Sequence, residues 1–274
     1  MAEAPLEAPA DVPVLLELRN VVKRFGSVEV LRGVSAKVRR GETLCILGGS
    51  GGGKTTLLKA MIGALRPTSG SIIVDGEDTS SYSERELDGV RRKIGVMFQS
   101  GALFNSMTIA ENVALPLEYH TKLDAETIST IVKIKLQQVD LLDAADRKPG
   151  EISGGMKKRA AVARALALDP KILFYDEPSA GLDPIATSRT DHLINRLKSS
   201  MGMTSIVVTH VMESVRRIAD RVLMLHKGQV LLDGSLDDLL GSQDPLVRQF
   251  VEGDLEGLAA GPETVEKYHE DLLM

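Results

Sequence analysis

The sequence lacks tryptophan, contains a single cysteine among its 274 residues, and is only 3% aromatic. It also lacks any run near the ~18 consecutive apolar residues of a membrane-spanning helix, so we expect a partner to supply any spans. Cys45 has no second cysteine to pair with, which excludes a disulfide-stapled scaffold. Because Leu44 and Ile46 flank it, we predict a buried, unreactive thiol in a reducing compartment.

An excess of positive charge is missing as well. Lys and Arg number 33 against 38 Asp and Glu, a formal net charge of −5, and the isoelectric point is near 5.6. This balance argues against a nucleic-acid partner. The N-terminal residues carry neither the basic start nor the apolar run of a signal peptide, so we expect a cytoplasmic location.

Composition divides the chain into three parts. Residues 1–13 are rich in Ala, Pro and Glu and are predicted to be a disordered leader. Residues 14–243 alternate β-rich apolar runs with helical patterns, which predicts an α/β fold, and residues 244–274 are predicted to be an acidic C-terminal extension. The expected strands are Thr43–Leu47, Ile72–Val74, Ile94–Phe98, Ile172–Tyr175 and Ser205–Thr209; the expected helices are Lys54–Leu65, Ala125–Val139, Gly154–Leu168, Ile185–Ser199 and Val211–Ala219.

A phosphate-binding pattern follows the first of these strands. Gly48-Gly49-Ser50-Gly51-Gly52-Gly53-Lys54-Thr55 matches G-x-x-x-x-G-K-[ST] between a strand and a helix, and Thr56 completes the predicted contact set. Glycines let successive backbone N–H groups turn around an anion, and the helix adds the positive end of its dipole. Lys54 is expected to reach the β- and γ-phosphates, and the Thr55 hydroxyl to ligate Mg²⁺. The alternative is a flexible glycine turn, but the strand–loop–helix context favours nucleoside triphosphate binding.

Two carboxylates end the apolar strand Ile172–Tyr175. Because ligands of parallel sheets bind at the carboxyl ends of the strands, Asp176 and Glu177 are expected to face the nucleotide. Asp176 would hold Mg²⁺ through water, and Glu177 would polarise the attacking water as a general base. The alternative is a strand end with solvated acids. The phosphate-binding loop makes these residues the expected second half of an NTPase site.

Four further motifs occur in a fixed order. They are Gln99 at the end of the strand Ile94–Phe98, Ser153-Gly154-Gly155-Met156 at a helix start, Gly181-Leu182-Asp183 beyond Glu177, and His210 after the strand Ser205–Thr209. Each alone has a structural interpretation, such as an N-cap for Ser153 or a solvated helical face for Lys157, Lys158 and Arg159. In this order across residues 48–210, the set resembles the ATP-binding cassette (ABC) ATPases.

The resemblance implies a fold and a set of roles. The fold is a P-loop NTPase with a RecA-like parallel-sheet core, an antiparallel β subdomain, and an α-helical subdomain at about residues 100–164. The expected cofactors are ATP and Mg²⁺. The implied roles are adenine stacking for Phe25, where many relatives carry Tyr, contact with Mg²⁺ or water for Gln99, a γ-phosphate clamp for His210, and contact with a second copy for Asp183.

The resemblance also implies a head-to-tail dimer. The helix start at Ser153, Gly154 and Gly155 would face the γ-phosphate held by another copy of the chain. One chain then holds half of each of two nucleotide sites, and ATP closes the pair. Loss of the γ-phosphate on hydrolysis would loosen it.

Details of the motifs resemble the ATPases of Mla/Mce-type lipid transport systems of diderm bacteria. These details are Met156 in the signature and the stretch Ser100-Gly101-Ala102-Leu103-Phe104. The resemblance implies phospholipid transport between inner and outer membranes, with an integral permease, a STAS-domain regulator and an MCE-domain protein as partners, at the cytoplasmic face of the inner membrane. The alternatives are another solute or lipoprotein transporter, or a non-transport ATPase of iron–sulphur assembly or cell division.

The segment after Gln99 is the expected permease contact. Residues 100–112 would line a groove for a permease helix, with Leu103 and Phe104 as the preferred contacts. The apolar residues of this segment could equally be core of the helical subdomain.

Overall fold

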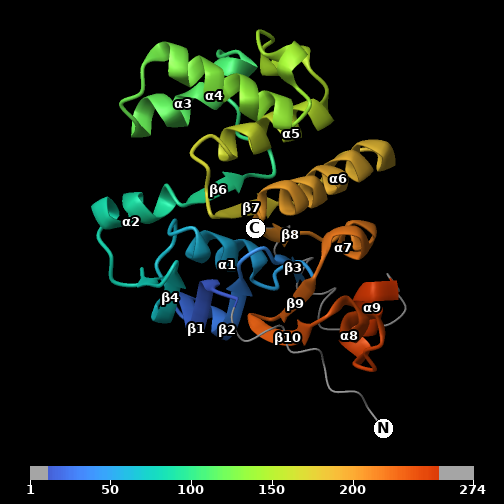
Figure 1. Cartoon of the computed structure of the whole chain (residues 1–274). Coiled ribbons are helices and arrows are strands. Elements are labelled where there is room, and N and C mark those ends of the chain that lie inside the picture. The colour runs from blue at the N-terminus through green and yellow to red at the C-terminus, as the bar shows by residue number, and fades with distance from the viewer. Residues whose placement is uncertain (1–11, 253–274) are drawn as a thin grey trace, which may run out of the picture.

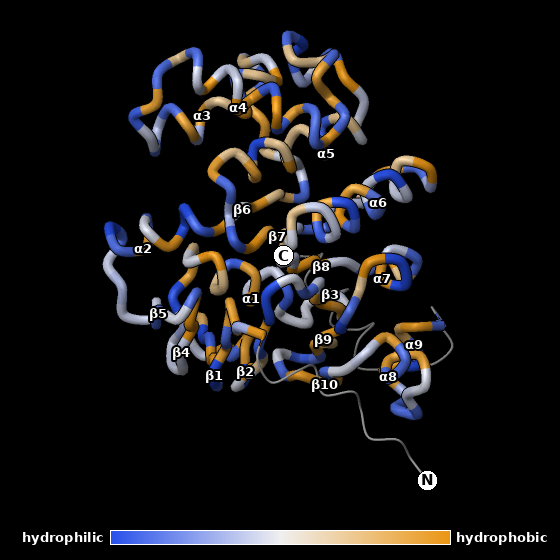
Figure 2. The backbone as a smooth tube through the Cα atoms, in the orientation of Figure 1, coloured by the Kyte–Doolittle hydropathy of each residue, from blue (hydrophilic) through white to orange (hydrophobic). Residues whose placement is uncertain are grey.

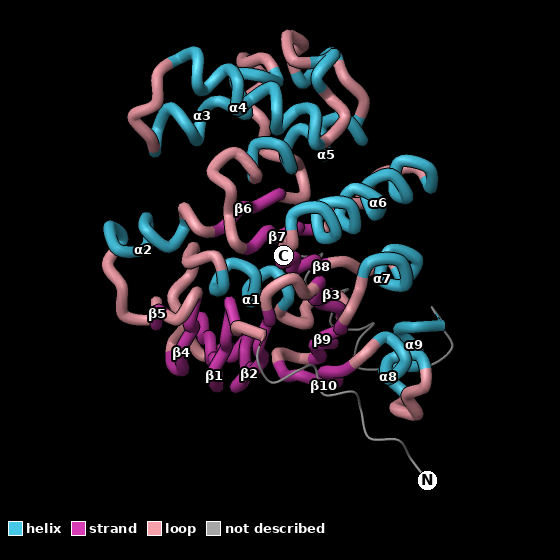
Figure 3. Tube along the Cα trace, viewed as in Figure 1, coloured by secondary structure: helices cyan, strands magenta, loops and turns pink. Residues whose placement is uncertain are grey.

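The computed structural model describes residues 12–252 of the chain. Residues 1–11 of the predicted leader and residues 253–274 of the predicted extension lie outside the described residues. Within the described part, strands gather in two sheets and helices gather mainly around one of them (Figures 1 and 3). No described helix is both long and apolar enough to cross a bilayer.

A six-stranded sheet forms the centre, in the order β10-β9-β3-β8-β7-β6. Its strands are β3 (Thr43–Leu47), β6 (Ile94–Met97), β7 (Ile172–Asp176), β8 (Thr204–Val208), β9 (Arg221–His226) and β10 (Gln229–Gly234). All neighbouring pairs are parallel except β9–β10. Every residue of β3 and β8 is buried, as expected of strands covered on both faces. Cys45 is fully buried, and burial raises the pKa of its thiol, so the predicted burial of this thiol is confirmed.

The sheet separates two hydrophobic cores (Figure 2). On one face, α1 (Lys54–Met61) packs between the central sheet and a second, antiparallel sheet of order β2-β1-β4-β5. Its strands are β1 (Val14–Phe25), β2 (Val28–Arg39), β4 (Ser69–Val74) and β5 (Glu77–Asp78). This sheet is the predicted antiparallel subdomain.

Helices cover the other face and extend above it (Figure 1). The helices α3 (Ile109–His120), α4 (Ala125–Gln138) and α5 (Gly154–Ala165) pack on one another as a separate group, which is the predicted helical subdomain. α6 (Pro184–Met201) and α7 (Met212–Ile218) lie directly against the sheet, and α2 (Glu84–Arg91) precedes β6. The predicted fold class, a parallel-sheet core with an antiparallel β subdomain and an α-helical subdomain, is therefore confirmed.

Two short helices follow the last strand. They are α8 (Leu236–Leu240) and α9 (Pro245–Glu252). Val247 of α9 is buried, and Phe250 packs against the same core as α6 and α7. The first residues of the predicted 244–274 extension therefore pack onto the cassette as an amphipathic helix.

Candidate functional site

The carboxyl ends of β3, β7 and β8 meet at one edge of the central sheet. The phosphate-binding loop leaves β3 at Gly48, Asp176 ends β7, and His210 follows β8. Because β3–β8 and β8–β7 are adjacent parallel pairs, three motifs that lie far apart in the sequence converge here.

The loop itself requires glycine at specific positions. Gly48 has φ of 142°, and a Cβ there would lie 2.2 Å from the carbonyl oxygen of Leu225. Gly53 precedes α1 with φ of 99°, and a Cβ there would lie 3.0 Å from Leu31 Cδ2. Within the described residues, no side chain caps the start of α1, so the first-turn N–H groups at Lys54, Thr55 and Thr56 lack a side-chain acceptor, as in helix starts that bind anions.

Lys54 closes over this loop. Its Nζ donates hydrogen bonds to the carbonyl oxygens of Gly48 at 2.6 Å and Gly49 at 2.9 Å. Burial lowers the pKa of the Lys54 ammonium, and the nearby Glu177 carboxylate opposes this shift. The ammonium is thus positioned at the mouth of the loop, where the charge of bound phosphates would lie.

Glu177 faces His210 across the edge of the sheet. The backbone N–H of Glu177 donates to the Val208 carbonyl at 2.9 Å, which fixes it beside β8. His210 Nδ1 lies 3.0 Å from Glu177 Oε1. An ionised carboxylate can only accept, so His210 donates from Nδ1.

The second oxygen of Glu177, Oε2, is buried and has no hydrogen-bond partner among residues 12–252. The Glu177 backbone lies in the left-handed region, at φ of 48°. A non-glycine residue in this conformation costs about 1–3 kcal/mol, and such strain clusters at functional sites. Beside it, burial raises the pKa of Asp176, and the charge of Glu177 adds to the rise. A positive ligand or a water molecule would satisfy these oxygens.

The residues present at this site fit ATP and Mg²⁺, the expected cofactors. Gly48 leaves no room for a side chain, Lys54 supplies a cation, and the orphaned Glu177 oxygen is placed for a water. Thr55 is exposed on the first turn of α1, and Asp176 is half-buried, so hydroxyl and carboxylate oxygens of the kind Mg²⁺ prefers are available. The site therefore fits ATP with Mg²⁺.

Gln99 is exposed at the end of β6, and its main chain is bound by a helix. Lys158 on α5 donates to the Gln99 carbonyl and, at 3.3 Å, to the Glu177 carbonyl. Arg164 donates to the carbonyls of Gly101 at 3.0 Å and Ala102 at 2.7 Å. The interpretation of a solvated helical face is wrong for Lys158, whose exposed fraction is 7%.

Asn112 fixes the other end of the same segment. Its buried amide accepts from the Phe104 N–H at 2.8 Å and donates to the carbonyls of Phe104 at 3.1 Å and Thr108 at 2.8 Å. Phe104 is 51% exposed, whereas Leu103 packs partly against the core. The sequence analysis did not predict that Lys158, Arg164 and Asn112 hold this segment. For Lys158 and Arg164, the available signal was two basic residues six positions apart in an alanine-rich helix.

The signature motif lies on different elements from the phosphate loop. Ser153 caps α5 and accepts from Met156 N–H, and Asp183 caps α6 by accepting from Ile185 and Ala186 N–H. A Cβ at Gly155 would lie 3.4 Å from Ala186 Cβ, so the two helix starts are closely packed. Ser153, Gly154 and Asp183 are all exposed. The structure thus brings Asp183 and the signature together, apart from Lys54.

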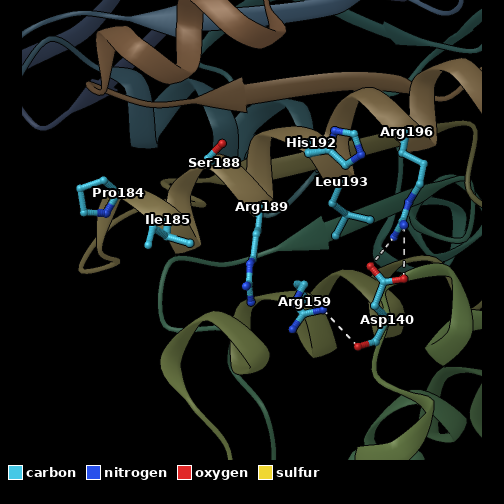
Figure 4. A pocket seen from close by; sticks show the side chains of 9 residues that line it. All are labelled: Asp140, Arg159, Pro184, Ile185, Ser188, Arg189, His192, Leu193 and Arg196. Atoms are coloured by element: carbon cyan, nitrogen blue, oxygen red, sulfur yellow. Dashed lines mark hydrogen bonds and ion pairs between the residues drawn. The ribbon is translucent and has the colours of Figure 1, made fainter.

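Two hollows lie along this face. One, of about 370 Å³, is lined by Ser153, Gly155 and Asp183 among others. The other, of about 500 Å³, continues between α5 and α6, and Arg159, Arg189 and Arg196 line it (Figure 4). Arg196 pairs with Asp140 at 2.9 Å, and Arg159 donates to backbone carbonyls. Neither hollow includes residues of the phosphate loop.

Phe25 ends β1 and is 50% exposed. Lys23 Nζ lies 5.1 Å from the centre of its ring. The hairpin partner β2 carries Val30, whose carbonyl oxygen would lie 3.2 Å from a Cβ at Gly53. Phe25 is thus a half-exposed aromatic side chain on the hairpin whose second strand adjoins Gly53, which is compatible with the predicted adenine contact.

The chain matches known proteins along most of its length. The family model described as ABC transporter matches residues 31–180. The intermembrane phospholipid transport system ATP-binding protein MlaF of Haemophilus influenzae is 43% identical over 89% of this chain and 92% of its own length. MlaF of Escherichia coli K12 is 40% identical over 94% of this chain and 96% of its own length. The probable ribonucleotide transport ATP-binding protein mkl of Mycobacterium leprae is 43% identical over 88% of this chain and 69% of its own length.

Solved structures share the fold. The dimeric ATP-binding cassette MJ0796, in a post-hydrolysis state with ADP and Pi, has a TM-score of 0.74 and 33% identity, covering 81% of this chain and 98% of that one. The protein cbiO1 of Clostridium perfringens, part of the transporter complex cbiONQ, has a TM-score of 0.78 and 30% identity, covering 89% and 97%.

Proposed function

Because the chain belongs to the ABC transporter family, as an ATP-hydrolysing subunit, we propose that it powers phospholipid transport between the inner and outer membranes through a permease. The observation that carries the proposal is the alignment with two MlaF proteins over 92% and 96% of their lengths. Met156 in the signature and the Ser100–Phe104 stretch support it.

The residues of one edge of the sheet would perform the hydrolysis. The glycine loop and Lys54 bind the β- and γ-phosphates of ATP, and Phe25 stacks on the base. Thr55, Gln99 and Asp176 would hold Mg²⁺, which neutralises charge on the phosphates. Glu177 accepts a proton from the attacking water through its unpaired Oε2, and His210 orients the carboxylate through Oε1 and reaches the γ-phosphate when ATP is bound.

A second copy of the chain would complete each site. The exposed helix start at Ser153, Gly154 and Gly155 would face the γ-phosphate of ATP on the other copy, with Asp183 beside it. The dimeric state of the MJ0796 cassette supports this arrangement. ATP then closes the dimer, and hydrolysis opens it.

The partners follow from the same proposal. An integral permease would contact the exposed Phe104, and a STAS-domain regulator and an MCE-domain protein would join the complex. The cassette would lie at the cytoplasmic face of the inner membrane. Asn112 holds the backbone of Phe104, and Arg164 holds the carbonyl of Ala102 in the loop that follows Gln99, so a displacement at the permease contact would be transmitted along this loop to the site.

Ribonucleotide transport is the second candidate, because mkl and the Haemophilus influenzae MlaF are both 43% identical to this chain. The two candidates differ in what the membrane partner carries. The test is to purify the chain with its permease, identify bound lipid by mass spectrometry, and follow ATP-dependent movement of a fluorescent phospholipid from proteoliposomes. Glu177→Gln is the matched inactive control.

The proposal expects copurifying phospholipid and ATP-dependent lipid movement that Glu177→Gln abolishes. Bound ribonucleotide, with lipid that does not move, would transfer the assignment to the second candidate. ATP hydrolysis that no membrane partner alters would refute any transport role.

A further inference from the structure

Lys158 is a buried cation that contacts two parts of the nucleotide site at once. Its ammonium donates to the carbonyl of Gln99 and to that of Glu177, although these residues are on different loops. The side chain belongs to α5, the helix that begins at the signature motif. One side chain of the helical subdomain therefore bridges the two loops expected to act on ATP.

The contact belongs to a continuous seam. Lys158, Ala161 and Arg164 are spaced by three along one face of α5. Residues 99–102 run along this face: Lys158 binds Gln99, a Cβ at Gly101 would touch Ala161 at 3.7 Å, and Arg164 binds Gly101 and Ala102. The loop after β6 is thereby attached to α5 along its backbone. Within this seam, Lys158 is the member that also reaches the catalytic strand β7.

Placing an ammonium here has a cost. Lys158 is 7% exposed, and burial lowers the pKa of its ammonium, while the charges of Asp176 and Glu177 oppose the shift. Replacing a whole buried ion pair by apolar residues is often neutral or stabilising, whereas removing one partner leaves the other unsatisfied. Removal of the Lys158 ammonium would take a donor from the carbonyls of Gln99 and Glu177, so the lysine contributes to stability, and kinetics must separate a positioning role from that contribution.

Glu177 is the residue that most needs a fixed backbone. Its φ of 48° is strained, and its carbonyl accepts from Ala180 N–H at 3.2 Å as well as from Lys158. The direction of this peptide sets where the carboxylate points. A displacement of about 1 Å at a reacting group costs about 100-fold in rate.

We infer that Lys158 is a positioning residue, whose ammonium holds the backbones of Gln99 and Glu177 in one arrangement and makes hydrolysis depend on where α5 lies. When α5 moves with the helical subdomain, the bridge moves or breaks, and both side chains shift together. Lys158 touches neither ATP nor water in this role. The inference rests on the proposed roles of Glu177 and Gln99.

The test is steady-state ATP hydrolysis by the full chain, with nucleotide binding and thermal unfolding measured in parallel. Lys158→Met removes the donor, and Lys158→Gln keeps a polar end on a shorter side chain in case the first variant does not fold. Lys158→Arg restores a cationic donor. Lys157→Met is the matched control, since the neighbouring side chain makes no hydrogen bond within residues 12–252.

We expect Lys158→Met and Lys158→Gln to lower kcat by at least about tenfold, with KM for MgATP within about twofold, when turnover is measured well below the unfolding temperature of every variant. Lys158→Arg should recover part of the loss, and Lys157→Met should match the unmodified chain. A purely structural role would instead lower the unfolding temperature while leaving the kcat of the folded variants within about twofold of that of the unmodified chain.

A smaller fall in kcat, or equal turnover by the Met and Arg variants, would overturn the inference. Glu177→Gln separates this failure from failure of the proposed site. If Glu177→Gln is inactive while Lys158→Met is normal, only the role of Lys158 is wrong. If Glu177→Gln retains turnover, the base itself is misassigned.

Discussion

Replacement of Asn112 by alanine would remove the hydrogen bonds that hold the proposed permease-contact segment, residues 100–112, to α3. The Asn112 amide is fully buried and makes three short hydrogen bonds to the backbone of Phe104 and Thr108. Each such bond contributes about 0.5–1.5 kcal/mol net, and the N–H of Phe104 would lose its partner. Because Phe104 is half exposed, water can replace part of that loss. We therefore expect the free energy of unfolding to fall by about 2–3 kcal/mol.

Urea unfolding followed by circular dichroism measures this change, because the chain has no tryptophan to report by fluorescence. Asn105→Ala is the control: this exposed side chain makes no hydrogen bond within the described part of the chain, so its change should stay within about 0.5 kcal/mol. ATP binding should persist in Asn112→Ala, whereas stimulation of hydrolysis by the permease should fall. A loss of stability below about 1 kcal/mol would show that the amide does not hold this segment.

Three further changes test the nucleotide site. Lys54→Ala should weaken MgATP binding and abolish hydrolysis, because it removes the charge over the loop; unchanged turnover would reject this loop as the phosphate site. Glu177→Gln should lower kcat by about 10²–10⁴-fold while ATP still binds, and the closed dimer should accumulate in size-exclusion chromatography; a variant that stays monomeric with ATP argues against Glu177 as the base. Gly48→Ala should lose ATP affinity, since its Cβ would meet the Leu225 carbonyl at 2.2 Å; Gly49→Ala has open space and should lose less, and equal losses would contradict the steric argument.

Four strands of the central sheet, β3, β6, β7 and β8, were predicted, and burial on both faces leaves continuous apolar runs in β3 and β8; β9 and β10 were not predicted. β3 occupies Thr43–Leu47 as predicted, and β8 starts one residue earlier than expected. The helix after the loop was expected to reach Leu65 but ends at Met61. There Gly63 takes φ of 68°, and the N–H groups of Ala64 and Leu65 turn back to the Lys59 carbonyl.

The long strands β1 and β2 were not predicted individually. Their pairing is interrupted by irregularities, one of them between Leu18 and Val21, where Asn20 has a positive φ of 49°. Such a bulge breaks the alternation of buried and exposed residues on which strand prediction depends. The interruption is set by pairing with residues far along the chain, so a local pattern does not contain it.

Motif order was sufficient to predict the nucleotide site but not what supports it. Lys158 and Arg164 donate to backbone carbonyls. Because every residue has a backbone carbonyl, the residue type does not indicate which carbonyl accepts such a bond. Lys157, Lys158 and Arg159 look alike in sequence, yet only Lys158 is buried, because the helix rotates each by about 100° from the next. The partner of a buried cation is therefore a tertiary property.

The starts of α5 and α6, which carry Ser153 and Asp183 and are proposed to meet a second copy, are packed closely enough to move together. Gly154 and Gly155 allow α5 to approach the start of α6, with Leu182 and Ala186 at 3.7 Å and 3.4 Å from where Cβ atoms would lie. A larger residue would force the helices apart and separate Ser153 from Asp183. The seam along Lys158 fastens the same helix to the loop of Gln99. A shift of α5 thus moves the face toward a second copy and the loop beside this copy's own nucleotide together, which is what coupling between two sites requires.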